Sequence, residues 1–292
     1  MSTDPPALLV IGHGSRSAQG VAEYWSLLDI LRGQDPSLVI GGGFIELAPP
    51  DLDTAIDGLV GMGRRSIVAV PLVLLGAGHL KDDGPEALAR ARSRHPSVEF
   101  RYGRALDIHP LLLDVAGARI NEALAGGDGH PSAVVLVGRG SSDPDANADL
   151  HKVARLLQDM GGIDMVEPSF VSLAAPGVAA ALDRCRRLGA TGVAVVPYFL
   201  FTGILVDRIG HQARAWEAEH PGVGVRVGRH LGPAAGVARL ILERYREART
   251  GDAHMNCDCC TYRAAARGQE GASGLRVRFP GMTEQPPVPP HR

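Results

Sequence analysis

The sequence predicts an α/β protein made of two similar halves, each with a four-stranded parallel sheet flanked by helices, and with a cleft between them. Three observations support this prediction. Short apolar runs alternate with longer segments of helical periodicity, which is typical of parallel sheets covered by helices. A glycine-rich turn follows the first apolar run. This turn and its surroundings return in the second half of the chain at a constant spacing.

The first half reads as four strand–helix units. Its first strand is a continuous apolar run closed by Gly12, as in a strand that is buried on both faces. The predicted strands are Leu8–Ile11, Leu38–Phe44, Ser66–Val70 and Val98–Tyr102. A helix follows each strand: the first has Val21, Tyr24, Trp25, Leu28 and Leu31 on its buried face, the second starts at Pro49–Pro50, the third runs through Arg94 and the fourth is Ile108–Leu124. The apolar loop Pro71–Gly78 and the segment His79–Asp83 lie between the third strand and its helix.

The second half repeats the first. Gly12 and Gly138, Phe44 and Phe170, and Pro71 and Pro197 form pairs that are each 126 residues apart. A constant spacing over this length indicates a duplication. We therefore expect an N-terminal half at 1–125, a C-terminal half at 131–250, and a tail at 251–292 that is rich in glycine and proline and is expected to be disordered.

Composition excludes several classes of protein. The formal charge of −2, with basic and acidic residues interspersed, gives no electrostatic surface for nucleic acid or for a membrane. The longest apolar run is too short to span a bilayer. The N-terminus has no basic region leading into an apolar segment, so we expect a cytoplasmic protein. The oligomeric state is left open.

Three residues of the first half follow predicted strands. His13 comes after the first strand, Glu46 after the second, and His79 lies in the loop after the third. Carboxyl ends of parallel strands share one edge of a sheet, where ligands bind. Two imidazoles and a carboxylate suit a first-row divalent metal ion and can also accept protons. At the corresponding positions the second half has Arg139, Ser172 and Leu205, so all three candidates are replaced together.

Other interpretations of these residues are open. A single histidine after a strand is often an ordinary hydrogen-bonded loop residue. The turn Gly12–Ser15 could bind phosphate at the start of a helix, although it lacks the ending of a P-loop and the spacing of a dinucleotide fingerprint. Ser15 could act as a nucleophile, but no nucleophile elbow surrounds it. We prefer binding of a carboxylate by Ser15, Arg16 and the helix N-terminus.

The motifs Gly12-His13-Gly14-Ser15, Phe44-Ile45-Glu46-Leu47-Ala48-Pro49 and Pro71-Leu72-Val73-Leu74-Leu75, followed by Gly78-His79, resemble those of the sirohydrochlorin chelatases. This family contains CbiX-type cobaltochelatases and ferrochelatases of cobalamin and sirohaem synthesis. The resemblance covers Leu8 to Arg249. It implies two tandem chelatase-like domains of flavodoxin-like fold, and an enzyme that inserts Co²⁺, our first choice, or Fe²⁺ into sirohydrochlorin without ATP.

The resemblance also implies roles for individual residues. His13 and His79 would bind the metal and act in catalysis, with Glu46 assisting. The macrocycle would lie on the apolar loops Leu72–Leu75 and Tyr198–Phe201. The predicted substrate-binding residues are Ser15, Arg16, Leu74, Leu75, Gly78, Arg139, Ser141 and Arg208. A carrier of metal or tetrapyrrole with the same fold is the main alternative, and a phosphohydrolase that uses His13 is a third.

Three of the four cysteines lie close together in the tail, at Cys257, Cys259 and Cys260. The segment contains Met-x-Cys-x-x-Cys, which is similar to the redox-centre motif of long CbiX-type cobaltochelatases and implies a possible iron–sulfur cluster. A cluster usually takes four cysteine ligands, so a second chain or Cys259 would have to contribute. A tail with reactive thiols is the alternative. Cys185 is predicted to be a small buried apolar residue in a helix.

Overall fold

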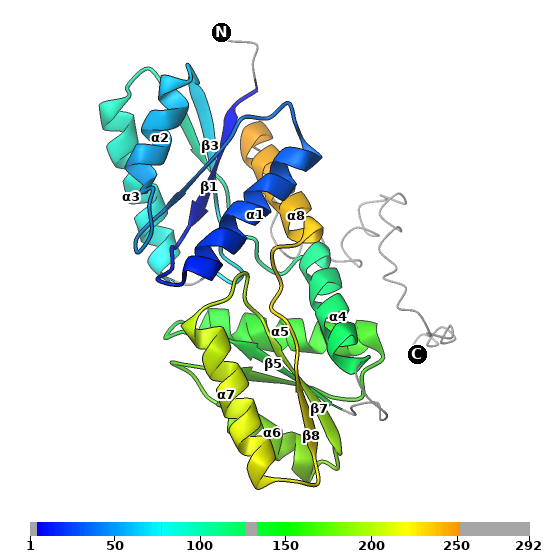
Figure 1. The fold of residues 1–292 in the computed structure, drawn as a ribbon. Coiled ribbons are helices and arrows are strands. Elements are labelled where there is room, and N and C mark those ends of the chain that lie inside the picture. The colour runs from blue at the N-terminus through cyan, green and yellow to red at the C-terminus, as the bar shows by residue number, and fades with distance from the viewer. Residues whose placement is uncertain (1–4, 77, 126–132, 252–292) are drawn as a thin grey trace, which may run out of the picture.

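The computed structural model describes residues 5–76, 78–125 and 133–251, and of residues 78–83 the backbone only. Two four-stranded parallel sheets are joined by helices (Figure 1). The strands are β1 (Ala7–Gly12), β2 (Ile40–Phe44), β3 (Ser66–Pro71), β4 (Glu99–Tyr102), β5 (Ala133–Gly138), β6 (Val166–Phe170), β7 (Gly192–Pro197) and β8 (Gly224–Val227). The helices are α1 (Ala18–Gln34), α2 (Leu52–Gly61), α3 (Gly78–Arg94), α4 (Pro110–Leu124), α5 (Pro144–Gly161), α6 (Val178–Arg187), α7 (Ile204–Glu219) and α8 (Ala235–Thr250).

The first sheet has β1 inside, in the order β2-β1-β3-β4. All six residues of β1 are buried. Side chains of a strand alternate between the two faces of its sheet, so Leu8 and Val10 join the core beneath α1, whereas Leu9 and Ile11 join the core beneath α2 and α3. The predicted burial of this strand on both faces is confirmed.

The second sheet repeats the first, with the order β6-β5-β7-β8. The register is also the same, because Ile11 pairs with Pro71 in the first sheet and Val137 pairs with Pro197 in the second. In both sheets the carboxyl ends of the strands point toward the other half (Figure 1). The predicted α/β class and the internal duplication are confirmed.

The last helix of each repeat packs on the sheet of the other repeat. Val237 and Ile241 of α8 belong to the core formed by β1, β3 and α1, and Figure 1 shows α8 in orange beside α1 in blue. Ala116 and Ile120 of α4 belong to the core formed by β5, β7 and α5. The sequence gives no sign of this exchange. The packed units are therefore not the two contiguous segments of the duplication.

Two buried arginines hold the exchanged helices in place. Arg244 of α8 is fully buried and donates hydrogen bonds to the carbonyl oxygens of Ala105 (3.0 Å) and Leu106 (2.6 Å) and to the Glu247 carboxylate (2.7 Å). Arg119 of α4 donates to the carbonyl oxygen of His230 (2.9 Å). A buried cation is tolerated only with such partners. Each arginine thus ties its helix to loops of the opposite repeat.

The apolar loops after β3 and β7 are more deeply buried than we expected. Leu72, Val73, Tyr198 and Leu200 are all buried in the core, so they are not available as a surface for a macrocycle. The reason is that each loop crosses to the other half: Leu200 packs in the core beneath α1 and α8, and Leu74 contacts the cores of both halves. The expectation of two exposed apolar loops is therefore wrong for these four residues.

The starts of α2 and α3 are among the boundaries that differ from the predicted ones. Helix α2 begins at Leu52 rather than at the proline pair, because Asp51 takes the N-cap position and its carboxylate accepts a hydrogen bond from the N–H of Thr54 at 2.7 Å. Helix α3 begins at Gly78, so the backbone of His79 lies in the first turn of a helix and not in the preceding loop.

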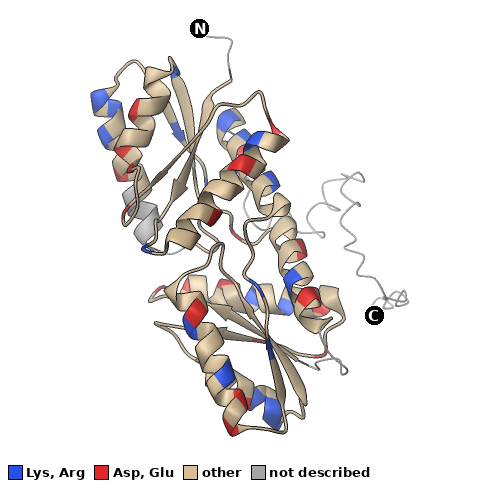
Figure 2. Cartoon of the chain, viewed as in Figure 1, with Lys and Arg blue, Asp and Glu red and all other residues tan. Residues whose placement is uncertain are grey.

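Charged residues of both signs are scattered over the helices of both halves (Figure 2). On the described helices in this view the two signs are mixed, in agreement with the near-neutral net charge. Within the described residues, no helix combines the length and the apolar character needed to cross a bilayer.

Candidate functional site

The turn after β1 is locked to the turn after β2 by backbone hydrogen bonds. The N–H groups of Ile45 and Glu46 donate to the carbonyl oxygens of Gly12 (2.9 Å) and His13 (3.0 Å). Gly14 has a φ of +100° and lies so close to the Glu46 carbonyl oxygen that a Cβ atom would collide with it. Only glycine fits at this position, which explains the second glycine of the motif.

This backbone arrangement brings two predicted site residues together. Nε2 of His13 lies 3.2 Å from Oε1 of Glu46, and the side chains are 48% and 54% exposed. The pair stands on the rim of the first sheet, beyond the carboxyl ends of β1 and β2. Because both groups are open to solvent and carry nitrogen and oxygen donors, they could bind a divalent metal ion or exchange protons with a ligand.

His79, the third predicted ligand, has only its backbone described, and its side chain lies outside the described residues. Gly78 precedes it as the first residue of α3. Among the described residues no group of three histidine, cysteine or carboxylate side chains could hold a metal ion. The complete metal site with His79 therefore stays a prediction.

The second half keeps the backbone of this site but changes its side chains. Val171 and Ser172 donate to the carbonyl oxygens of Gly138 and Arg139, both at 3.0 Å. Gly140 has a φ of +86°, and, as at Gly14, a Cβ atom there would collide with the facing carbonyl oxygen, that of Ser172. Arg139 replaces His13 and is exposed; it makes no hydrogen bond or ion pair with the described part of the chain.

Both turns continue into the same strained conformation. Leu47 has a φ of +65°, and the N–H of Ala48 donates to the carbonyl oxygen of Glu46 at 2.8 Å. Leu173 has a φ of +58°, with the matching bond from Ala174 to Ser172 at 2.7 Å. A three-residue turn with a positive φ at its centre is rare and strained.

The remaining predicted binding residues lie around these turns. Ser15 Oγ accepts a hydrogen bond from the N–H of Ser17 (3.0 Å), and Ser141 Oγ accepts one from Asp143 (3.0 Å), so both hydroxyls order the start of a helix. Arg16 and Arg208 are exposed. Leu74 and Leu75 are half-buried and pack against core residues. Binding of a ligand by these residues stays a prediction.

A polar contact between the halves lies beside this site and is not apparent from the sequence. Glu23 of α1 accepts a hydrogen bond from the N–H of Thr202 at 2.7 Å and lies 2.9 Å from His230 Nε2. A Cβ atom on Gly20 would lie 2.7 Å from the Thr202 carbonyl oxygen, and one on Gly203 would lie 3.9 Å from Ser15 Oγ. The loop after β7 is thus docked against the turn that carries Ser15.

The buried phenol of Tyr198 lies near the carboxylates of Asp107 and Asp149. Burial raises the pKa of the Tyr198 phenol, and the negative charges of Asp107 and Asp149 raise it further. Burial also raises the pKa of both carboxyls. The Tyr198 hydroxyl has no hydrogen-bond partner among the described residues. Of these groups, Tyr198 directly follows β7 but is predicted only as part of an apolar loop, whereas Asp107 and Asp149 are absent from the predicted site because neither of them directly follows a strand.

The family model described as CbiX matches the chain twice, over residues 7–123 and 133–248. The chain belongs to the CbiX family. The two matches coincide with the two repeats, so the duplication consists of two CbiX units. The parallel sheets, the histidine turn after β1 and its altered copy after β5 are therefore features of a doubled CbiX fold.

Relatives of this CbiX chain match it over nearly its whole length. It is 35% identical over 260 residues to a sirohydrochlorin cobaltochelatase of Priestia megaterium, covering 88% of this chain and 84% of that protein. It is 32% identical over 261 residues to a sirohydrochlorin ferrochelatase of Bacillus subtilis, covering 89% and 98%. The solved structure of SirB from Bacillus subtilis with Fe³⁺ has a TM-score of 0.74 at 33% identity and covers 85% of this chain and 96% of its own.

The cysteines of this CbiX chain fall into two groups. Cys185 lies in the core beneath α6 and α7, and burial raises the pKa of its thiol to about 11. The prediction of a small buried apolar residue is confirmed. Cys257, Cys259 and Cys260 lie outside the described residues. An iron–sulfur cluster or redox role for them stays a prediction.

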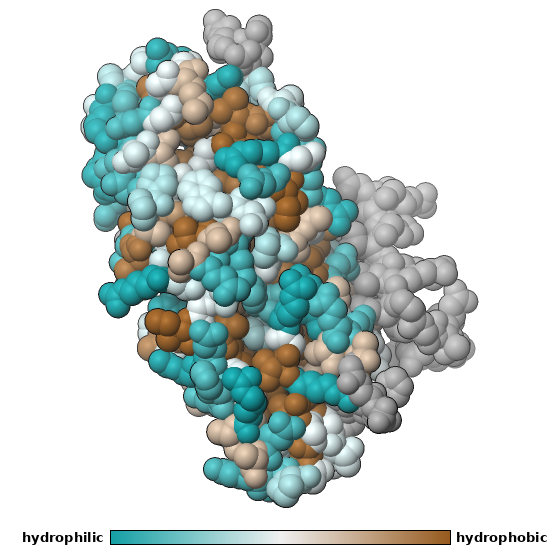
Figure 3. All heavy atoms as spheres, viewed as in Figure 1, coloured by the Kyte–Doolittle hydropathy of each residue, from teal (hydrophilic) through white to brown (hydrophobic). Residues whose placement is uncertain are grey.

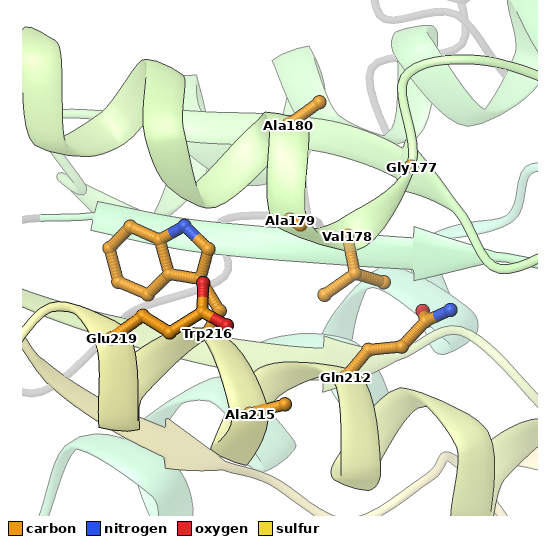
Figure 4. A pocket seen from close by; sticks show the side chains of 8 residues that line it. All are labelled: Gly177, Val178, Ala179, Ala180, Gln212, Ala215, Trp216 and Glu219. Atoms are coloured by element: carbon orange, nitrogen blue, oxygen red, sulfur yellow. The ribbon is translucent and has the colours of Figure 1, made fainter.

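A surface pocket in the second CbiX unit holds none of the predicted site residues. It lies between α6 and α7 (Figure 4), and its lining consists of Gly177, Val178, Ala179, Ala180, Gln212, Ala215, Trp216 and Glu219. Trp216 is largely buried, and its ring stacks on His220 at a centroid distance of 4.0 Å. The pocket offers no set of metal ligands, so the rim around His13 and Glu46 is the better candidate site.

Proposed function

We propose that this chain is a sirohydrochlorin chelatase, an enzyme that inserts a divalent metal ion into a polycarboxylated tetrapyrrole without ATP. The observation that carries the proposal is the exposed pair of His13 and Glu46, 3.2 Å apart, beyond the strands of a CbiX-family half. The names of the two relatives described above support the substrate and the reaction.

Insertion exchanges two pyrrole N–H protons for one metal ion, so the site has to hold the ion and then accept protons. His13 and His79 supply neutral imidazole nitrogen and Glu46 supplies carboxylate oxygen, which together suit a first-row ion. When the ion moves to the macrocycle, the freed imidazoles of His13 and His79 accept the two pyrrole protons, one each. Glu46, in contact with His13 and half-exposed, passes the proton of His13 to solvent, and His79 releases its proton before the next ion binds.

Basic and polar groups of both halves bind the carboxylates of the substrate. Arg16 stands beside the metal site, and Arg139 and Arg208 are exposed on the second half. Ser15 and Ser141 can still donate their hydroxyl hydrogens. Charge-assisted hydrogen bonds of this kind are about twice as strong as neutral ones. Leu74, Leu75 and Gly78 complete the proposed contacts from the first half.

The proposed metal is Co²⁺, with Fe²⁺ as the alternative. Relatives named for both metals match this chain at similar identity, and SirB structures contain Fe³⁺ or cobalt. The preference for cobalt depends on the cysteine motif of the tail. Affinity at an N/O site follows the general order of divalent ions, so it does not by itself select the physiological metal.

Turnover tests the proposal. Catalytic amounts of the protein are incubated with sirohydrochlorin and either Co²⁺ or Fe²⁺ under reducing conditions, and the metallated product is followed by absorbance. An enzyme gives many equivalents of product per chain above the uncatalysed rate. A carrier gives at most one, and that result would contradict the proposed function.

A further inference from the structure

Two exposed leucines occupy the same place in both repeats. Leu47 is 48% exposed and Leu173 is 68% exposed. They are 126 residues apart in the chain, the spacing of the duplication. Each follows an edge strand, β2 or β6, at the carboxyl end that points toward the other half. Apolar surface is visible on both sides of the line where the halves meet (Figure 3).

The backbone at both leucines is one that leucine adopts poorly. The φ angles of +65° and +58° lie in the left-handed region, where glycine and asparagine are favoured. Because both side chains are exposed, packing in the core does not offset the strain. Backbone hydrogen bonds hold both turns in this conformation. A leucine that stands there in both repeats, exposed and not packed in a core, points to a use of its side chain.

The neighbours of these leucines place them on the ligand side of the turns. Leu47 directly follows Glu46, which contacts His13. Leu173 directly follows Ser172, whose N–H donates to the Arg139 carbonyl oxygen. The metal-binding side chains differ between the halves, but the strained leucine is the same. The feature that the two rims have in common is therefore an exposed apolar side chain and not a set of metal ligands.

We propose that Leu47 and Leu173 are the apolar residues that contact the macrocycle, one from each half. This inference rests on the proposed function and extends it to the substrate contacts. The four core-buried residues of the loops after β3 and β7 cannot serve this purpose. A tetrapyrrole has an apolar ring with a carboxylate periphery, which fits a leucine on each rim beside exposed arginines.

Asparagine is the informative replacement, because it tolerates a positive φ and removes the apolar surface. In Leu47→Asn and Leu173→Asn we expect an unchanged or higher melting temperature. The Kd for metal-free sirohydrochlorin, measured by fluorescence titration, should rise about tenfold for each, as expected when part of a leucine no longer becomes buried. The KM should rise in parallel, with kcat within about twofold of wild type. Leu47→Met keeps an apolar side chain, so its Kd should stay within about twofold of the wild-type value.

Leu188→Asn is the matched control. Leu188 is 70% exposed at the end of α6. Because α6 runs back along the sheet from β6, this residue lies at the amino ends of the strands, away from the candidate site. Its Kd should equal that of wild type. Leu173→Asn is the decisive variant because its neighbour is not a metal ligand, and a wild-type Kd for it would overturn the proposal. A wild-type chain that binds sirohydrochlorin without turnover would instead contradict the chelatase activity, and the leucine variants would still test the contacts.

Discussion

Glu23 and His230 join the two halves of the protein through a contact 2.9 Å long between the carboxylate and the imidazole. The same carboxylate oxygen also accepts the N–H of Thr202. Both side chains are largely buried, with 16% and 13% exposed. Ser15 lies next to this contact because the loop after β7 packs against the start of α1. The turn that carries His13 is thus attached to the second half.

Replacing Glu23 should therefore weaken the whole fold. In Glu23→Ala the Thr202 N–H and His230 lose their partner, and we expect a loss of about 1.5 to 3 kcal/mol in the free energy of unfolding. Urea denaturation of the two single variants and the double variant with His230→Ala measures the coupling. The exposed pair Arg155–Asp159 is the control, since Asp159→Ala should cost less than about 0.5 kcal/mol. Strictly additive effects at Glu23 and His230 would show that the pair is not coupled.

The asymmetry of the repeats predicts a division of labour. His13→Ala should abolish metal insertion and leave the Kd for sirohydrochlorin nearly unchanged. Arg139→Ala should raise that Kd about ten- to a hundredfold, because a charge-assisted contact is worth about 1.5 to 3 kcal/mol. Steady-state kinetics and a direct titration separate the two effects. Loss of turnover in Arg139→Ala with normal binding would contradict this division.

Gly14 should not tolerate a side chain. In Gly14→Ala the new Cβ would collide with the Glu46 carbonyl oxygen, so the two turns have to separate and the metal site is lost. Gly63 is the matched control, because it has a φ of +82° but no atom lies within 4 Å of the place that a Cβ atom would take. Gly63→Ala should cost only the strain of the left-handed backbone, about 1 to 2 kcal/mol. Equal insertion rates in the two variants would contradict the role of close contact.

Stability should also depend on the ionisation of Asp149. Burial, followed by the charge of Asp107, raises the pKa of Asp149 above its ordinary value of 3.8. The folded state therefore binds this proton more tightly than the unfolded state. The stabilisation is complete below the ordinary pKa and is lost as the pH rises through the raised value. Asp149→Asn should raise the melting temperature at pH 7, and the difference should shrink toward pH 4. An equal difference at both pH values would rule out this cause.

Much of the fold can be predicted because its signals are local. The apolar run of β1 is continuous, and the buried residues of α1 recur at helical spacing, so strand and helix follow directly from the sequence. The exchange of α4 and α8 cannot be predicted in this way. Either sheet could accept the apolar face of α8. Arg244 adds polar contacts to the first repeat, but its partners are two backbone carbonyl groups and a neighbouring glutamate, which no sequence pattern marks.

The candidate site, too, can be predicted only in part. Glu46 could be placed beside His13 because neighbouring parallel strands end at one edge. The contact of Glu23 with His230 could not, since 207 residues separate them and no motif contains either one. Leu47 did leave a signal. A leucine stands at this position in both repeats, whereas Glu46 is replaced by Ser172.

The position of α8 affects how the protein is made. This helix is the last described element of the chain, yet it covers one face of the first sheet and contacts α1 and β3. During synthesis on the ribosome, residues of that face such as Leu8 and Val70 stay exposed until residues near 250 have emerged. The first repeat is thus translated early and completed late. Nascent chains shorter than this should expose that apolar face to chaperones.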